Sequence, residues 1–296
     1  MITTFSRTDD AEVAVTAALA GAAVVRDLYG GRLDRIDKGG GDFATAADLA
    51  AERAILDVIR AARPKDALLG EEGGEQGAAG AGRQWLVDPL CGTLNYAAGT
   101  QVVAVNVALR DGTPEGIPDG THEGTPGGTH AGTPDGTPGG TARTAVAAVA
   151  DPFGGEVLWT DGERAWARRD GADTPLVPSG AVRLVDVNLD PPFPHAPGFR
   201  AVDLLAHPGF VAGFRPRVVS STLAVAWVAA GRRAAYVTDG GDLSGSVHFA
   251  AGIALCRAAG CVVTGIDGRP PGPAGHGLVV AADAATHAEL MALIRK

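Results

Sequence analysis

Hydrophobic residues recur along the chain at two spacings, one typical of helices and one typical of strands. Helical spacing predicts helices over residues 11–29, 45–63, 221–230, 246–259 and 284–294. Short apolar runs predict strands over residues 84–87, 102–109, 145–150, 156–159, 182–187, 234–238, 261–264 and 278–281. The first strand is expected to end at Asp88-Pro89, because proline cannot donate to a strand ladder. Helices and strands alternate in the second half, which predicts an α/β fold built in layers.

One segment departs from this pattern. Residues 111–142 repeat Gly-Thr-Pro and Gly-Thr-His units and contain almost no apolar side chain that could join a core. We interpret the segment as a mobile loop. Because a predicted strand lies on each side, it is expected to be a long hairpin connection and not a domain linker. Its His122 and His130 could bind a metal, but solvated loop histidines are far more common.

Composition narrows the classes of function. A chain of 296 residues, 46% of them hydrophobic, can bury one large core or two moderate ones. The formal net charge of -9 and the lack of a basic stripe argue against nucleic-acid binding. No apolar run reaches the roughly 18 residues that a membrane span needs, so we expect a cytoplasmic protein without membrane contact. The cysteines Cys91, Cys256 and Cys261 lack metal-binding spacing and are expected to be reduced thiols.

Four short segments carry side chains suited to chemistry. They are DFATAAD at 42–48, GEEG at 70–73, WLVDPLCGTLNY at 85–96 and VHFAAG at 247–252. The third segment places a carboxylate, a thiol, a hydroxyl and exposed backbone groups at the end of a buried strand, where binding groups gather. Taken alone, Asp42 and Asp48 are better explained as ordinary acids at the start of a helix that Thr45 can cap.

In their order and spacing, the four segments resemble the motifs of the inositol monophosphatase family, D-x-x-T-x-x-D, G-E-E, W-x-[IV]-D-P-[IL]-D-G-T-x-N-[FY] and W-D-x-A-A-G. Residues 162–166 and 217–231 resemble two further motifs of that family. The resemblance implies a layered α-β-α-β-α sandwich, with an α+β half at 1–150 and an α/β half at 151–296. It also implies a homodimer that hydrolyses phosphate from a small phosphorylated alcohol, such as a sugar, cyclitol or nucleotide.

The resemblance assigns roles to individual residues. Glu71, Asp88 and the Leu90 carbonyl would hold one Mg²⁺, an ion that prefers hard oxygen ligands. Thr93 and Asp48 would orient the attacking water, and the backbone amides of Gly92 and Thr93 would hold the phosphate.

The sequence departs from the family at two aspartates, which are replaced by Cys91 and His248. In the family these aspartates and the equivalent of Asp88 bind a second metal. Loss of two carboxylates disfavours a second Mg²⁺, whereas Zn²⁺, or alternatively Mn²⁺, could use the thiol and imidazole. Groups that share a metal must be close, so we expect the Cys91 sulfur and the His248 ring to approach within roughly 3 to 5 Å. An imidazole beside a thiol is expected to lower the thiol pKa, although a cysteine can also be simple packing.

Three hypotheses follow. The first is a phosphatase with one Mg²⁺, in which protonated His248 donates a proton to the leaving oxygen. The second is an enzyme of specialised biosynthesis that uses the Cys91/His248 pair for transfer, cyclisation or elimination. The third is a ligand-binding protein without turnover. Residues 220–222, Asp239 and Asp242 are candidates for substrate contact, but the spacing between Gly231 and His248 differs from the family pattern and leaves the substrate open.

Overall fold

The computed structural model describes residues 7–31, 35–39, 42–77, 81–111, 143–189, 201–239, 243, 245–271 and 276–295. The predicted loop lies outside the described residues from residue 112 onward, and so do His122, His130 and Asp242. The two strands that flank this segment pair antiparallel, as expected for a hairpin connection.

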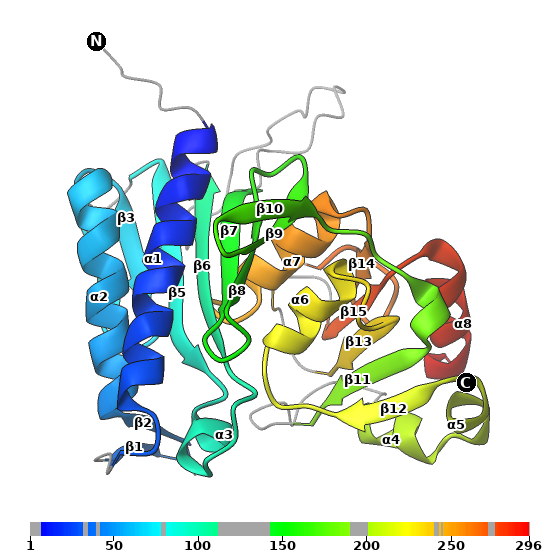
Figure 1. Cartoon of the computed structure of the whole chain (residues 1–296). Coiled ribbons are helices and arrows are strands. Elements are labelled where there is room, and N and C mark those ends of the chain that lie inside the picture. Colours follow the sequence, from blue (N-terminus) through cyan, green and yellow to red (C-terminus); the bar gives the residue numbers. More distant parts are fainter. Residues whose placement is uncertain are drawn as a thin grey trace, which may run out of the picture.

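An eight-stranded sheet forms the first half of the molecule (Figure 1). Its spatial order is β10-β9-β8-β7-β6-β5-β3-β4, and only the β3–β5 pair is parallel. The strands are β3 (Ala67–Gly70), β4 (Gly74–Gln76), β5 (Arg83–Cys91), β6 (Ala104–Asp111), β7 (Arg143–Asp151), β8 (Glu156–Thr160), β9 (Ala165–Arg169) and β10 (Ala172–Pro175). Helices α1 (Arg7–Leu28) and α2 (Ala46–Ala62) cover one face, and a hairpin of β1 (Arg35–Gly39) and β2 (Asp42–Thr45) leads into α2.

A five-stranded sheet forms the second half, in the order β12-β11-β13-β15-β14. Its strands are β11 (Leu184–Asn188), β12 (Arg215–Val218), β13 (Ala235–Thr238), β14 (Val262–Thr264) and β15 (Leu278–Ala281). Helices α6 (Leu223–Ala229) and α7 (Ala250–Ala258) lie between the two sheets, while α4 (Ala201–Ala206), α5 (Pro208–Gly213) and α8 (Ala284–Ile294) cover the outer face (Figure 1). The predicted α-β-α-β-α layering is therefore confirmed.

Alternation along β5 decides where its functional residues lie. Trp85 and Val87 join the core under α1 and α2, whereas Leu86 joins the core under α6 and α7. Asp88 follows the same alternation and lies on the inner side of the sheet, opposite Asn106 of β6. Asp88 and Asn106 are thus buried polar side chains between the layers.

Two of the predicted boundaries that were wrong concern the functional segments. Strand β5 does not stop before Pro89 but continues to Cys91, with a register shift between Asp88 and Cys91. A proline is tolerated there because an irregular ladder needs no donor at that point. Helix α7 begins at Ala250 and not at Ser246, so His248 lies in the turn that precedes the helix.

The division into halves at residue 150 stays a prediction. The larger sheet itself continues past this point through β8, β9 and β10. No helix among the described residues has both the length and the apolar character needed to cross a bilayer.

Candidate functional site

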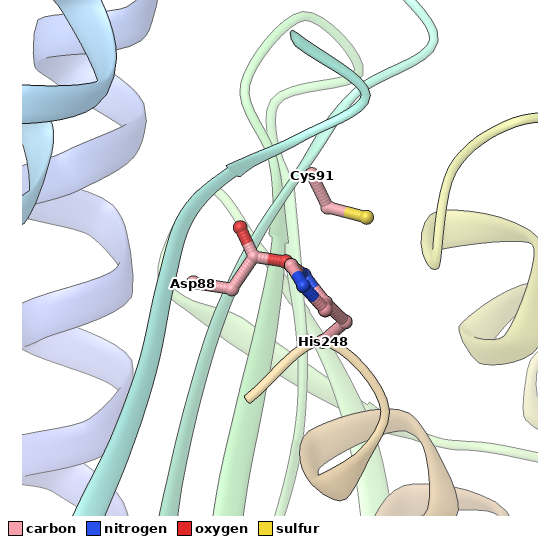
Figure 2. A group of neighbouring side chains, drawn as sticks. All are labelled: Asp88, Cys91 and His248. Atoms are coloured by element: carbon pink, nitrogen blue, oxygen red, sulfur yellow. The ribbon is translucent and has the colours of Figure 1, made fainter. Parts of the chain in front are cut away.

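Asp88 is the centre of the site. Its carboxylate is fully buried at the inner face of β5, and each of its oxygens has a partner (Figure 2). Oδ1 accepts a hydrogen bond from the Leu90 amide at 3.1 Å. Oδ2 lies 2.8 Å from Nδ1 of His248 and accepts a weaker bond from Nδ2 of Asn106 at 3.3 Å. The turn before α7 therefore brings an imidazole directly onto the strand carboxylate.

The Asp88–His248 contact is an ion pair. Burial opposes charge on Asp88, but the imidazolium of His248 outweighs it and holds the pKa of Asp88 below its usual range. Burial likewise lowers the pKa of His248, but the Asp88 carboxylate raises it to about 12. The His248 side chain is 41% exposed, so the charged ring also reaches the solvent side of the site.

Glu71 lies next to this pair at the end of β3. Its amide donates to the Val87 carbonyl at 3.0 Å, which fixes the start of the GEEG turn beside β5. Oε1 accepts from Nζ of Lys38 at 3.1 Å, while Oε2 is buried, has no hydrogen-bond partner within the described ranges and lies 3.9 Å from Nδ1 of His248. Burial, and then the charge of Asp88, raise the pKa of Glu71 to about 8.

The Cys91 thiol completes a three-residue group at the end of β5. One ligand atom from each of Asp88, Cys91 and His248 lies within 4.8 Å of the other two, which agrees with the expected closeness of thiol and imidazole (Figure 2). The sulfur accepts a hydrogen bond from the Thr222 amide at 3.3 Å. The expected fall in the thiol pKa was wrong, because burial and the nearby Asp88 raise the pKa of Cys91 despite the imidazole.

Asp48 and Thr93 form the opposite side of the site. Oδ2 of Asp48 accepts bonds from the amide and hydroxyl of Thr45 at 2.8 and 2.6 Å, as part of a capping box at the start of α2. Oδ1 is left for the Thr93 hydroxyl at 3.0 Å, which also lies 3.1 Å from the Leu90 carbonyl. The capping geometry thus aims one carboxylate oxygen at the site.

Gly92 connects the two sides through a backbone turn that requires glycine. Its φ is +100°, and a Cβ there would lie 3.1 Å from the carbonyl oxygens of Val102 and Ser220. Asn95 donates to the same two oxygens at 2.9 and 2.7 Å. Helix α3 (Thr93–Ala97) starts directly after this turn, so its first amides are not used within the helix.

Sequence reasoning missed three supporting residues. Lys38 pairs with Glu71 and, at 2.6 Å, with Glu72. Glu52 accepts from the Glu72 amide at 2.8 Å, and its carboxylate fills the space where Gly70 lacks a side chain. Asn106 bridges Asp88 to the Thr222 hydroxyl, 2.8 Å away. A signal for Asn106 existed, because it is the single polar residue in the apolar run of its strand.

The substrate candidates have different surroundings. Ser220, Ser221 and Thr222 lie beside the site, through the contacts of Ser220 with Asn95 and of Thr222 with Cys91 and Asn106. Asp239 is buried directly after β13, near Gly277. The first group is thus tied to the site by contacts.

On the side of Glu71, the donor atoms of the site fit a hard divalent cation. Glu71 and Asp88 offer carboxylate oxygens, the Glu71 oxygen Oε2 is buried and unpaired among the described residues, and Leu90 offers a carbonyl next to Asp88. A buried carboxylate oxygen without a donor is a costly arrangement that a bound cation relieves.

Comparisons with known proteins match the chain to one family. The sequence profile of the inositol monophosphatase family matches residues 7–118 and 141–296. The inositol-1-monophosphatase ImpA of Mycolicibacterium smegmatis is 31% identical over 271 residues, 87% of this chain and 83% of that protein. The extragenic suppressor protein suhB of Bartonella henselae has a similar structure, with a TM-score of 0.72, 25% identity and coverage of 96% and 98% of the two chains.

Other similarities are more local. A glucose-1-phosphate thymidylyltransferase of Streptomyces griseus is 37% identical over 103 residues. This match covers 34% of the chain and 40% of the length of that relative.

Proposed function

Because the chain belongs to the inositol monophosphatase family, we propose that it hydrolyses a phosphate monoester of a small alcohol and that His248 replaces a second cation of the site. One observation carries the second part. Nδ1 of His248 lies 2.8 Å from Oδ2 of Asp88 and 3.9 Å from Oε2 of Glu71, so a positive imidazolium neutralises Asp88 where a cation would otherwise be needed. Its relative ImpA carries the name of an inositol-1-monophosphatase.

One Mg²⁺ is assigned to Glu71, Asp88 and the Leu90 carbonyl. When bound, the ion supplies positive charge that draws electrons from the phosphoryl group and activates water. The unpaired oxygen of Glu71 and the hard character of all three donors support this assignment. Mn²⁺ has similar ligand preferences and is expected to replace Mg²⁺.

Asp48 and Thr93 prepare the nucleophile. The Thr93 hydroxyl donates its proton to Oδ1 of Asp48. The lone pairs of the Thr93 oxygen can therefore accept a hydrogen bond from the attacking water. Asp48 holds the hydroxyl in this orientation because its other oxygen is already occupied by Thr45. The amides of Gly92 and Thr93, at the start of α3, are assigned to the phosphate oxygens.

His248 acts on the leaving group. Its Nδ1–H is held by Asp88, and an imidazolium carries a second proton on Nε2 that can pass to the departing alkoxide. A positioned general acid contributes about 10²–10⁴-fold to a rate. The exposure of the ring on one side allows the leaving alcohol to reach it.

The test is phosphate release from a panel of sugar, cyclitol and nucleotide monophosphates, with Mg²⁺ or with a chelator. We expect release that requires Mg²⁺ and that is abolished in Asp88→Asn, a variant that keeps the shape of the side chain but not its charge. Cys261→Ser, a change at a thiol outside the site, is the control. No release from any member of the panel would refute a phosphatase.

The closeness of Cys91 and His248 favours one second candidate, an enzyme with a nucleophilic thiol. This candidate needs a thiolate, whereas burial and Asp88 raise the pKa of Cys91. It predicts activity that is lost on alkylation and in Cys91→Ala and that persists in the presence of a chelator. A ligand that binds tightly in calorimetry and is recovered unchanged would instead indicate a binding protein.

The remaining assignments concern partners. We propose a homodimer, as implied by family membership, acting on a small phosphorylated molecule and not on nucleic acid. Light scattering after size-exclusion chromatography gives the mass, and a monomer would contradict the first assignment.

A further inference from the structure

We propose that Asp88, Cys91 and His248 form a binding site for one thiophilic divalent cation of the Zn²⁺ type, and that this ion inhibits the Mg²⁺-dependent reaction. The inhibition rests on the proposed function, whereas the binding does not. The three side chains converge from the end of β5 and from the turn before α7 (Figure 2).

The distances suit a tetrahedral ion. With bonds of about 2.0–2.3 Å, neighbouring donors around Zn²⁺ lie roughly 3.5 Å apart. The donor atoms here lie within 4.8 Å of one another, and Nδ1 of His248 lies 2.8 Å from Oδ2 of Asp88. Side-chain movements of roughly 1 Å bring all three into this geometry.

The donor types select the metal. A thiolate, an imidazole and a carboxylate are ordinary ligands of Zn²⁺ and Co²⁺, whereas Mg²⁺ requires oxygen. Thiolate and carboxylate together balance the charge of the dication, and three protein ligands leave a fourth position for water. The site of the proposed Mg²⁺, with Glu71 and the Leu90 carbonyl, contains oxygen donors only, so the two ions prefer different sets that share Asp88.

Neighbouring donors hold the ligands in place. The Thr222 amide donates to the Cys91 sulfur at 3.3 Å, which stabilises negative charge on sulfur. The Leu90 amide and the Asn106 side chain orient the two Asp88 oxygens. The backbone amide of His248 donates to the hydroxyl of Ser246 at 3.3 Å and so steadies the turn. Such outer contacts are typical of metal sites.

Binding changes the protons and the function of the site. The S–H bond of Cys91 breaks and its proton enters solvent, together with any proton on the ring nitrogen that binds the ion. His248 can then no longer act as an acid, and Asp88 is withdrawn from Mg²⁺. The partial exposure of the His248 side chain gives the ion a route of entry.

Co²⁺ is the direct probe, because its bond to a thiolate gives a charge-transfer absorption that hard ligands do not give. The full chain is treated with a chelator, desalted and titrated with Co²⁺ under reducing conditions. We expect the absorption to saturate at one ion per chain, to disappear on addition of Zn²⁺ and to persist in excess Mg²⁺.

Cysteine variants assign the signal. Cys91→Ser and His248→Ala should lose the band, whereas Cys256→Ala and Cys261→Ser, which change the other two thiols, should keep it. Circular dichroism of each variant verifies that it is folded. The absence of a band in the wild type, or an equal band in folded Cys91→Ser, overturns the proposal.

The inhibition is measured separately. The rate of each variant with Zn²⁺ is compared with its own rate in Mg²⁺ alone. Zn²⁺ should inhibit the wild type at least tenfold more strongly than Cys91→Ser. The reason is that loss of a ligand weakens metal binding by about 10–100-fold or more. Equal inhibition of both would refute the inhibitory role. A cobalt band without phosphate release would support the metal site and refute the phosphatase. Phosphate release without a cobalt band would support the phosphatase and refute the metal site.

Discussion

His248 is an unusual neighbour for a buried carboxylate in a proposed metal site, because it brings its own positive charge. The 2.8 Å contact with Asp88 accounts for the lowered pKa of the acid and the raised pKa of the base. Such a pair can hold a proton ready for a leaving group at neutral pH.

The acid role predicts a dependence on the leaving group. His248→Gln should lower kcat about 10²–10⁴-fold for an alkyl phosphate, whose alkoxide needs a proton. It should lower kcat much less for a nitrophenyl phosphate, whose leaving group departs without one. Steady-state rates on both substrates provide the measurement. An equal loss on both would indicate that His248 serves binding and does not donate a proton.

Asn106 is expected to position Asp88. It is fully buried, and its amide joins Oδ2 of Asp88 to the Thr222 hydroxyl. Asn106→Ala removes a donor from two buried acceptors, so the free energy of unfolding should fall by about 1–3 kcal/mol. Urea denaturation measures this change, with Thr222→Val as the partner variant of a double-mutant cycle. Additive effects of the two changes would argue against the bridge.

Residue-level prediction from sequence succeeded where the family resemblance carried the information. The resemblance implied that Cys91 and His248 replace two ligands of one metal and therefore lie close together, and their ligand atoms lie within 4.8 Å. It failed for the thiol pKa, which depends on burial and on the charge of Asp88. Lys38 could not have been found, since its contacts depend on how the β1–β2 hairpin folds over the GEEG turn.

At the scale of elements, α3 and the turn before it contact Ser220, in the segment that precedes α6, directly after the end of β5. Gly92 allows this because it has a positive φ and approaches two carbonyl oxygens. Gly99 ends the same segment with a φ of +78° but has open space around it. Substitutions at these two glycines therefore distinguish the effect of backbone strain from the effect of steric conflict.

Gly92→Ala and Gly99→Ala form a matched pair. A left-handed conformation costs an alanine about 1–2 kcal/mol, and this is the full effect expected at Gly99. Gly92→Ala should cost more and should reduce phosphate release, because the Cβ displaces the backbone that presents the Thr93 amide. Thermal unfolding and activity are measured for both. Equal destabilisation, with equal activity, would contradict the close approach.

The elements were predictable where apolar side chains repeat one spacing. The long helices α1, α2 and α8 and the apolar strands β6, β7, β13 and β15 were predicted for this reason. Among the elements that were missed, β1, β2, β4 and α3 are short and lack a run of regularly spaced apolar residues. The extension of β5 through Pro89 depends on a register shift with β6 that only tertiary structure provides.

At the scale of the whole molecule, the site joins the layers. Asp88 and Glu71 come from the larger sheet, Asp48 from α2, and His248 from the turn leading into the inner helix layer. Charges from separate layers must therefore balance when the chain folds and again when a cation binds. The link between cation binding and the charges of the site can be measured through the proton on Glu71.

Mg²⁺ binding is predicted to release a proton. Burial and Asp88 raise the pKa of Glu71 from 4.5 to about 8. Between these values the folded, metal-free chain holds a proton that the unfolded chain has lost, so this group's contribution to stability falls as pH rises. A cation needs the carboxylate, and its affinity should increase up to about pH 8 and then level.

Calorimetry in buffers of different ionisation enthalpy measures the released proton, and Glu71→Gln is the control that should abolish the release. The charge on His248 persists through this range because Asp88 raises its pKa to about 12. An affinity for Mg²⁺ that is independent of pH would contradict a protonated Glu71.

The most direct test of His248 as the replacement for a second cation is a crystal soaked with Mn²⁺ and phosphate, in which anomalous scattering counts the ions. We predict one peak, bound by Glu71, Asp88 and the Leu90 carbonyl, with His248 still hydrogen-bonded to Asp88. A second peak bound to Asp88 beside Cys91 and His248, or no peak at all, would contradict it.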